Sequence, residues 1–202
     1  MIDKQTIAVY NKQTEEYANL AQNSVVSQEL KEFISLIKPG GHVLDLGCGP
    51  AMDSAFMRDQ GLTVDPVDAS TEMVKLANSK FDIGARVARF EDITEIDAYD
   101  GIWANYSLLH ATADSFPTIL AALYRALRPG GWLHIGMKSG TGSQRDRLGR
   151  FYTYYTEEDL QAVLTATGFT IGSTKTGSTR GLAGDVEPWI MMDCCTEEPI
   201  TK

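Results

Sequence analysis

The hydrophobic positions of this chain recur with two different periods, which predict helices and strands in succession. Apolar residues fall at helical spacing in residues 5–21 and 25–37. His42–Leu46 is instead a short apolar run that ends in glycines, which is typical of a buried parallel strand. Strand and helix signals then alternate along the rest of the chain. Strands are expected at 62–67, 85–90, 99–105, 132–137, 169–173 and 188–193. Helices are expected at 52–60, after Ser70, at 114–127 and at 157–167, and loops at 138–150 and 174–187.

This alternation predicts an α/β fold with a doubly wound, mostly parallel Rossmann-like sheet, helices on both faces and an antiparallel strand near the C-terminus. The length of 202 residues suits one domain with at most a small lobe. We expect residues 1–38 to form an N-terminal helical cap segment and residues 39–202 to form the main domain.

Charge and composition narrow the class of protein. The net charge of −9 disfavours tight binding to nucleic acid, which needs clustered Lys and Arg. The chain has neither a signal-peptide pattern at its start nor about 18 consecutive apolar residues, so a cytoplasmic protein without a membrane span is expected. Cys48, Cys194 and Cys195 have no metal-ligand spacing, so we expect free thiols and no metal site.

The strongest chemical signal is the turn that follows the first predicted strand, Asp45-Leu46-Gly47-Cys48-Gly49. Its glycines let the backbone approach a ligand closely, and the helix that follows offers unpaired N–H groups. Asp68, which ends the second strand 21 positions beyond Gly47, lies where a carboxylate can accept both hydroxyls of a ribose. Both features also occur in ordinary turns, and Asp68 can equally be a capping residue.

Further polar residues end the third and fourth predicted strands, at the same edge of the sheet. Glu91 and Asp92 offer carboxylates to an adenine amino group, and Ile93 offers an apolar contact to its ring; a solvated acidic turn is the alternative. Asn105, Tyr106 and Ser107 are expected to line the crevice. A nicotinamide cofactor is disfavoured, because Met52 stands where the dinucleotide fingerprint needs Gly or Ala.

In these motifs the chain resembles the class I S-adenosylmethionine-dependent methyltransferases, over roughly residues 40–175. The matching segments are Asp45–Gly49, Val67–Ser70 with Met73, Glu91–Ile93, Leu108–His110 and Leu127–Gly131. Ala51 departs from the pattern, because the family usually has a third glycine there. The chain is most similar to small-molecule enzymes of the methyltransferase-11/25 type, a group that includes proteins linked to tellurite resistance.

The resemblance implies S-adenosylmethionine as cofactor, bound by the domain of residues 39–202. In similar enzymes an N-terminal segment folds over the donor, and Tyr10 and Tyr17 share one helix face here, although a core stripe would give the same pattern. The cofactor-binding residues expected are Tyr17, Asp45, Gly47, Cys48, Gly49, Asp68, Ala69, Met73, Glu91, Asp92, Ile93, Asn105 and Tyr106.

The implied reaction is in-line transfer of the methyl group to a small-molecule acceptor, for which alignment and exclusion of water are the main tasks of the protein. A general base is needed only if the acceptor carries a proton. His110 is the catalytic candidate for that role, with a packing role as its alternative, whereas His42 and His134 lie in strand patterns and are expected to be structural. Lys138, Arg145, Arg147 and Arg150 are interleaved with aromatic residues up to Tyr155 and offer sites for an anionic acceptor, or form a solvated loop.

Two other functions stay open at the level of sequence. Gly149–Tyr152, continuing through Glu158 and Leu160, loosely resembles a late segment of tRNA wobble-uridine methyltransferases, although the net charge argues against an RNA substrate. A non-catalytic subunit that only binds the donor is the second alternative, because fold alone does not fix function. We expect a monomer or a homodimer.

Overall fold

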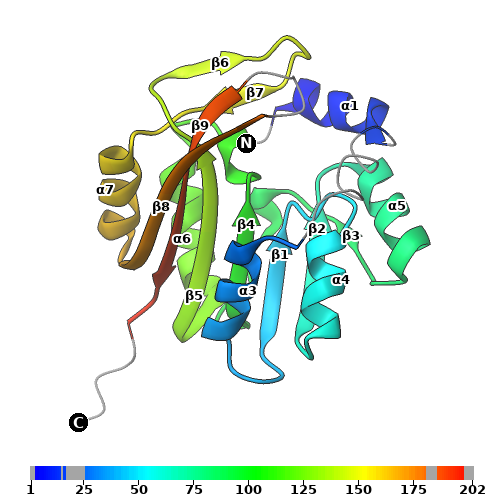
Figure 1. Ribbon diagram of the computed structural model, residues 1–202, viewed down its shortest axis with the longest axis vertical. Helices are drawn as coiled ribbons and strands as arrows, with labels where there is room; N and C mark the ends of the chain where they lie inside the picture. Colours follow the sequence, from blue (N-terminus) through cyan, green and yellow to red (C-terminus); the bar gives the residue numbers. More distant parts are fainter. Residues whose placement is uncertain (1–2, 15, 17–25, 181–185, 198–202) are drawn as a thin grey trace.

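A seven-stranded sheet runs through the computed structural model, which describes residues 3–14, 16, 26–180 and 186–197 (Figure 1). The strand order is β3-β2-β1-β4-β5-β9-β8; the first five strands are parallel, and β9 is antiparallel to both β5 and β8. The strands are β1 His42–Leu46, β2 Thr63–Asp68, β3 Arg86–Val87, β4 Tyr99–Asn105, β5 Leu127–Lys138, β8 Thr170–Arg180 and β9 Val186–Cys195. This arrangement confirms the predicted α/β class and the antiparallel C-terminal strands.

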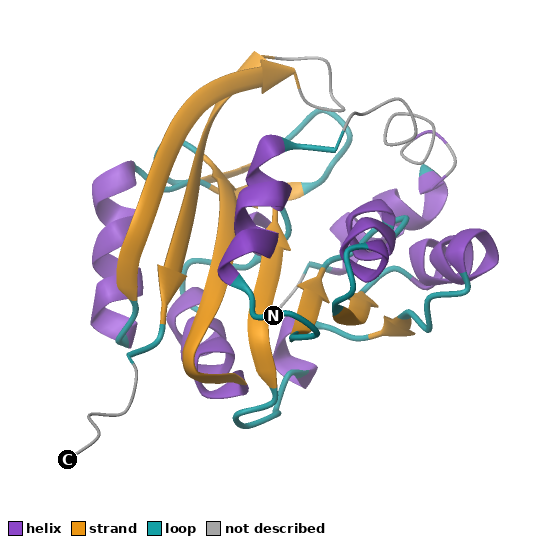
Figure 2. Cartoon of the chain, turned by 60° about the horizontal axis from the view of Figure 1, so that its bottom comes forward, coloured by secondary structure: helices purple, strands orange, loops and turns teal. Residues whose placement is uncertain are grey.

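Helices cover both faces of the sheet, as Figures 1 and 2 show. They are α1 Lys4–Lys12, α3 Gln28–Leu36, α4 Met52–Asp59, α5 Thr71–Phe81, α6 Phe116–Ala126 and α7 Glu157–Thr167. On one face Leu30 and Phe33 of α3 pack with Met57 of α4 against Trp103. The larger core lies on the other face, where the apolar sides of α6 and α7 meet β1, β4 and β5. No helix among these described residues combines the length and apolar character needed to cross a bilayer.

Short polar side chains set where several of these helices begin. Ser27, Ser70 and Thr156 each accept a hydrogen bond from a backbone N–H in the first turn of the following helix. Gly168 ends α7 with a φ of 111°, a left-handed conformation that glycine adopts at little cost. These capping residues explain why the predicted bounds of α5 and α7 agree closely with the structure.

The structure corrects several predicted elements. The strand expected at 85–90 is only two residues long, because the chain then turns into a 3-10 helix, η1 Phe90–Asp92, that brings Phe90 into the core. The expected loop at 138–150 contains β6 Ser143–Arg145, which pairs with β7 Phe151–Thr153. Of the expected connection at 174–187, residues 174–180 belong to β8 and residues 186–187 to β9, while 181–185 lie outside the described ranges. In the helix predicted at 5–21, α1 ends at Lys12, and residues 17–25 lie outside the described ranges.

The antiparallel strands are joined to the parallel sheet by a buried hydrogen-bonded pair. His134 of β5 donates from Nδ1 to Asp193 of β9 at 2.7 Å, and the Ser173 hydroxyl of β8 donates to the other carboxylate oxygen at 2.8 Å. Burial alone would raise the pKa of Asp193, but His134 and Ser173 outweigh it, and this pKa lies below its ordinary value. One carboxylate therefore links three neighbouring strands.

We predict that Asp193→Ala lowers the free energy of unfolding by about 3 kcal/mol, because it leaves the His134 imidazole buried without a partner. Ser173→Ala is the matched control and should cost only about 1 kcal/mol, since the pair itself remains. Urea denaturation at neutral pH measures both values. Equal losses of unfolding free energy in the two variants would show that the contact with His134 stabilises the fold no more than the contact with Ser173 does.

Candidate functional site

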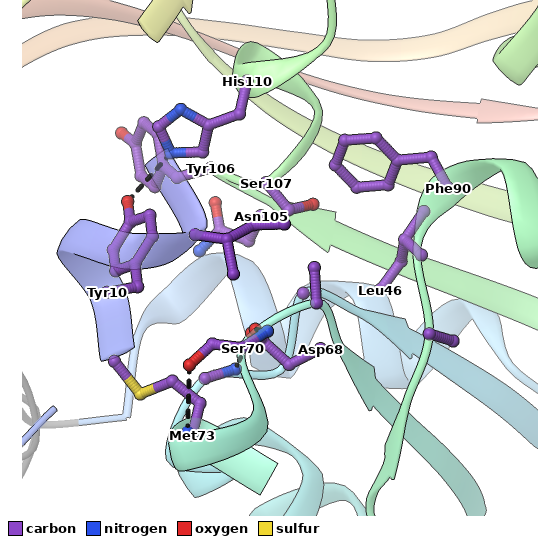
Figure 3. A pocket seen from close by; sticks show the side chains of 15 residues that line it. Tyr10, Leu46, Asp68, Ser70, Met73, Phe90, Asn105, Tyr106, Ser107 and His110 are labelled. Atoms are coloured by element: carbon purple, nitrogen blue, oxygen red, sulfur yellow. Dashed lines mark hydrogen bonds between the residues drawn. The ribbon is translucent and has the colours of Figure 1, made fainter. Parts of the chain in front are cut away.

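A pocket opens at the carboxyl ends of the parallel strands, between α1, α5 and the segment that follows β4 (Figure 3). The empty space within it, open mouth included, is about 620 Å³. This is where ligands bind in open α/β sheets. The lining residues are Ile7, Tyr10, Leu46, Gly47, Gly49, Asp68, Ala69, Ser70, Met73, Ala88, Phe90, Asn105, Tyr106, Ser107 and His110.

The glycine turn forms one wall of this pocket. Gly47 has a φ of 85°, and a Cβ atom on it would lie 2.4 Å from the Cβ of Ser107, so no larger residue fits. The N–H groups of Gly47 and Cys48 both donate to the carbonyl of Val67, which fixes the turn to β2. Ala51, where a third glycine was expected, also has a positive φ, 61°, and is the N-cap residue of α4. Alanine therefore holds a left-handed conformation there, at a cost of about 1–2 kcal/mol.

Asp68 fastens the same turn and faces the pocket. Its two carboxylate oxygens accept hydrogen bonds from Ser70 N at 2.7 Å and from Gly49 N at 2.9 Å. Burial raises the pKa of this carboxyl, and the two backbone N–H groups oppose that rise. Asp65, by contrast, is bound by Arg86 and Tyr99 and does not reach the pocket. The structure thus presents one carboxylate, that of Asp68, at the strand end where a ribose was expected.

Asp45 lies behind the glycine turn and does not line the pocket. Only 3% of its surface is exposed, and the Ser54 hydroxyl donates to it at 2.5 Å. Burial, together with the nearby charges of Asp53 and Asp68, raises the pKa of Asp45 to about 8. A positively charged group beside the turn would favour its ionised form.

Two buried polar atoms of the lining have no hydrogen-bond partner among the described residues. They are Oδ1 of Asn105, which ends β4, and Oγ of Ser107, two residues further on. Buried polar atoms are normally paired, so such atoms in a pocket indicate hydrogen bonds to a ligand. Tyr106 between them has a φ of 55°, a strained conformation of the kind that clusters at functional sites. These residues fit a ligand that carries several polar groups.

Helix α1 covers one side of the pocket. The Tyr10 hydroxyl of α1 donates to Nε2 of His110 at 2.8 Å, while Nδ1 of His110 donates to the Phe151 carbonyl at 2.6 Å. Since a carbonyl only accepts, Nδ1 carries a proton, and Nε2 accepts the Tyr10 hydroxyl when the imidazole is neutral. Burial lowers the pKa of His110 to about 4, and the charges of Arg150 and Lys138 add to this effect.

The hairpin β6–β7 holds α1 in this position. Arg145 makes two hydrogen bonds to Asp3, at 2.8 and 2.9 Å, and the N–H of Phe151 donates to the Thr6 hydroxyl at 2.8 Å. Arg150 is bound by Asp146 and also donates to the Tyr10 hydroxyl at 3.3 Å. Lys138 pairs with Glu187. Three of the four cations considered for an anionic acceptor are therefore already paired with carboxylates.

The predicted site residues divide into two groups. Those that line the pocket are Gly47, Gly49, Asp68, Ala69, Met73, Asn105, Tyr106 and His110. Asp45, Cys48, Glu91, Asp92 and Ile93 do not line it: Cys48 and Ile93 are buried in the core, Glu91 is exposed, and Asp92 accepts from the N–H of Arg89. Tyr17 lies outside the described residues. The binding roles of all these residues stay predictions.

Several lining residues were not assigned to the site from the sequence. Ile7, Leu46, Ala88 and Phe90 are apolar and look like ordinary core positions in the sequence, and Ser70 looks like a helix cap. Ser107, by contrast, was expected at the crevice, because it ends the fourth predicted strand together with Asn105 and Tyr106. Tyr10 gave a usable signal through its helical spacing with Tyr17.

Comparison with known proteins agrees with this geometry. Residues 43–131 match the family described as methyltransferase domain. Over 93 residues the chain is 38% identical to a malonyl-[acyl-carrier protein] O-methyltransferase of Enterobacter lignolyticus. The matched segment covers 45% of this chain and 36% of that protein. The chain thus spans about a third of the length of that relative.

Solved structures share the fold over nearly the whole chain. The 1,6-didemethyltoxoflavin-N1-methyltransferase of Burkholderia thailandensis, solved with S-adenosylhomocysteine, has a TM-score of 0.72 and 22% identity, covering 95% of this chain and 88% of that one. A TehB-like S-adenosylmethionine-dependent methyltransferase of Corynebacterium glutamicum has a TM-score of 0.69 and 20% identity, covering 93% and 99%. Residues 43–131 therefore match a methyltransferase domain in sequence, and the chain shares its fold with S-adenosylmethionine-dependent methyltransferases.

Proposed function

We propose that this chain transfers a methyl group from S-adenosylmethionine to a small-molecule acceptor held beside Tyr10, Tyr106 and His110. The observation that carries the proposal is the pocket itself, which joins the glycine turn and Asp68 to the unpartnered polar atoms of Asn105 and Ser107. When bound, S-adenosylmethionine supplies a methyl group that its positively charged sulfur already activates.

The residues of the pocket suit the parts of such a donor. Asp68 offers its carboxylate to ribose hydroxyls, and the apolar side chains of Ala88 and Phe90 offer contacts to an adenine ring. We propose that Glu91, Asp92 and Ile93 support this end from outside the lining. Asn105 and Ser107 provide hydrogen-bonding atoms for the polar amino-acid end, and Asp45 acts on its ammonium group from behind the turn, through water.

The acceptor is proposed to be small because the pocket is closed by α1. Tyr10, Tyr106 and His110 gather on one side of the pocket, away from Asp68 and Ser70 (Figure 3). Relatives named for ubiquinone biosynthesis and for toxoflavin synthesis act on small molecules, which supports this class. The net charge of −9 supports it further, because it disfavours an RNA substrate.

Calorimetric titration tests the donor assignment directly. We expect S-adenosylmethionine and S-adenosylhomocysteine to bind and NAD to give no heat of binding, since the turn after β1 lacks the dinucleotide fingerprint at Met52. Binding of NAD alone would contradict the proposal.

Asp68→Ala should weaken donor binding by about 1.5–3 kcal/mol, the usual value of hydrogen bonds to a charged group. It should also lower the melting temperature, because Gly49 and Ser70 lose their shared acceptor. Asp59→Ala is the control, because it removes an exposed carboxylate at the end of α4. Donor affinity measured by calorimetry should be unchanged in the control; an unchanged affinity in Asp68→Ala would refute the ribose contact.

Asp45→Asn should stabilise the free protein and weaken donor binding. The raised pKa of Asp45 means that the folded state holds a proton that the unfolded state releases, so stability falls as the pH rises from about 4 to about 8. The variant removes this cost, and its gain in melting temperature should grow over that pH range and then level off. Melting curves from pH 5 to about 9, with calorimetry at pH 8, measure both effects. A less stable variant with full donor affinity would contradict both roles.

A further inference from the structure

The pocket offers few groups able to take a proton from an acceptor. Among its described lining residues, the titratable side chains are Tyr10, Asp68, Tyr106 and His110. Burial raises the pKa of both tyrosine hydroxyls, so they stay protonated at neutral pH. Asp68 accepts two backbone N–H groups on the opposite side of the pocket. His110 is left as the candidate base near the proposed acceptor.

Both nitrogens of His110 are already engaged. Nδ1 donates to the Phe151 carbonyl, and the lone pair of Nε2 accepts the Tyr10 hydroxyl, as the dashed line in Figure 3 shows. The Tyr10 hydroxyl also accepts a hydrogen bond from Arg150 and interacts with the side chain of Tyr152. The imidazole therefore has no lone pair open to an acceptor in this closed arrangement.

The surroundings of His110 also oppose a positive charge on it. It is 4% exposed and packs against Tyr10 and Tyr152. Arg150, from the hairpin, and Lys138, from β5, place positive charges nearby; Asp146 is the opposing negative charge. The lowered pKa of His110, about 4, agrees with this geometry, and a general base works best with a pKa near the operating pH.

A negatively charged acceptor lacks a partner as well. Arg145, Arg150 and Lys138 are paired with Asp3, Asp146 and Glu187. The described residues lining the pocket include neither Lys nor Arg, and Ile7, Leu46 and Phe90 add apolar walls. An anion placed there would lose its hydration without a compensating charge from the lining.

We infer that the acceptor is an uncharged molecule that reacts through a nitrogen whose lone pair is already free of a proton, and that Tyr10 and His110 are positioning residues. The inference rests on the proposed methyl transfer. In that step the carbon–sulfur bond of the donor breaks and a carbon–nitrogen bond forms with the nitrogen lone pair. The positive charge moves from sulfur to nitrogen, and no proton has to leave. Tyr106 borders the pocket with an aromatic ring, which favours a nearby cation, whereas the Tyr10 ring already has Arg150 beside it.

The first test observes His110 directly and needs no acceptor. In the complex with S-adenosylhomocysteine, nitrogen NMR of the imidazole, assigned with His110→Gln, should show a neutral ring protonated on Nδ1 from about pH 5.5 to about pH 8.5. An imidazole that titrates near pH 7 in this complex would make His110 an available base and overturn the inference. Failure of S-adenosylhomocysteine to bind in calorimetry would instead refute the proposed function.

The second test compares four bicyclic probes of similar size: isoquinoline, 2-naphthol, 2-naphthalenethiol and 2-naphthoate. Formation of S-adenosylhomocysteine is measured for the wild type, Tyr10→Phe, His110→Gln and the control Tyr124→Phe, whose ring packs on Phe169 outside the pocket. Isoquinoline should be methylated fastest, with turnover independent of pH above about pH 6.5, where its nitrogen carries no proton. Tyr10→Phe should reduce its kcat/KM about tenfold at most, as expected for one neutral hydrogen bond, without altering the pH profile.

The opposite pattern would overturn the inference. In that pattern 2-naphthol is the preferred substrate, and its turnover rises with pH. The same turnover falls about 100-fold in His110→Gln, as expected on loss of a general base. Preferred turnover of the thiolate or the carboxylate would overturn the uncharged class. So would a wild type that binds the donor and methylates none of the four probes.

Discussion

The carboxylate of Asp68 and the carbonyl of Val67 together hold the glycine turn against β2. Asp68 accepts the N–H groups of Gly49 and Ser70, and Val67 accepts those of Gly47 and Cys48. Through these contacts the end of β2 sets the turn before α4 and the start of α5. The wall of the pocket, the starts of α4 and α5 and the proposed ribose contact thus all depend on the end of β2.

The positive φ values near this turn show how tightly it is packed. Gly47 has no room for a side chain because Ser107 lies against it, and Ala51 and Tyr106 hold left-handed conformations without being glycine. Surrounding packing must stabilise such residues, since each costs about 1–3 kcal/mol on its own. That the strain gathers beside the unpartnered polar atoms of Asn105 and Ser107 fits a site shaped for binding rather than for stability alone.

The sequence predicted the parallel core of the sheet well, because strands such as β1 and β4 are short, largely apolar segments next to turn residues. It predicted only the first part of β8, as a strand at 169–173. The rest was missed because the side chains of this strand are mostly exposed and show no alternating apolar pattern. The sequence also missed the β6–β7 hairpin, whose pairing depends on contacts with α1, such as that of Arg145 with Asp3. Local pattern carries no information on contacts so distant in the chain.

The same limit applies to the site. Gly47, Gly49 and Asp68 were identifiable because their spacing follows from the βαβ geometry. The pairing of Tyr10 with His110 joins residues 100 positions apart, and no local signal in either segment shows that the two nitrogens of His110 are occupied. Assigning a proton-transfer role to a histidine needs its partners, and only the folded structure supplies them.

Asp45, Asp53 and Asp68 show how the fold and the proposed binding of a cation are connected. All three have raised pKa values, for which burial is the main cause, and Asp45 is raised further by the charges of the other two. Hydrogen bonds from Ser54, Trp103 and the turn relieve part of this cost without removing it. A ligand with a positive group beside the turn favours the ionised carboxylates, so below about pH 8 its binding is coupled to the loss of a proton from Asp45. The acidic cluster behind the turn therefore favours a cationic donor over neutral or anionic nucleotides, through the same interactions that destabilise the fold when no ligand is bound.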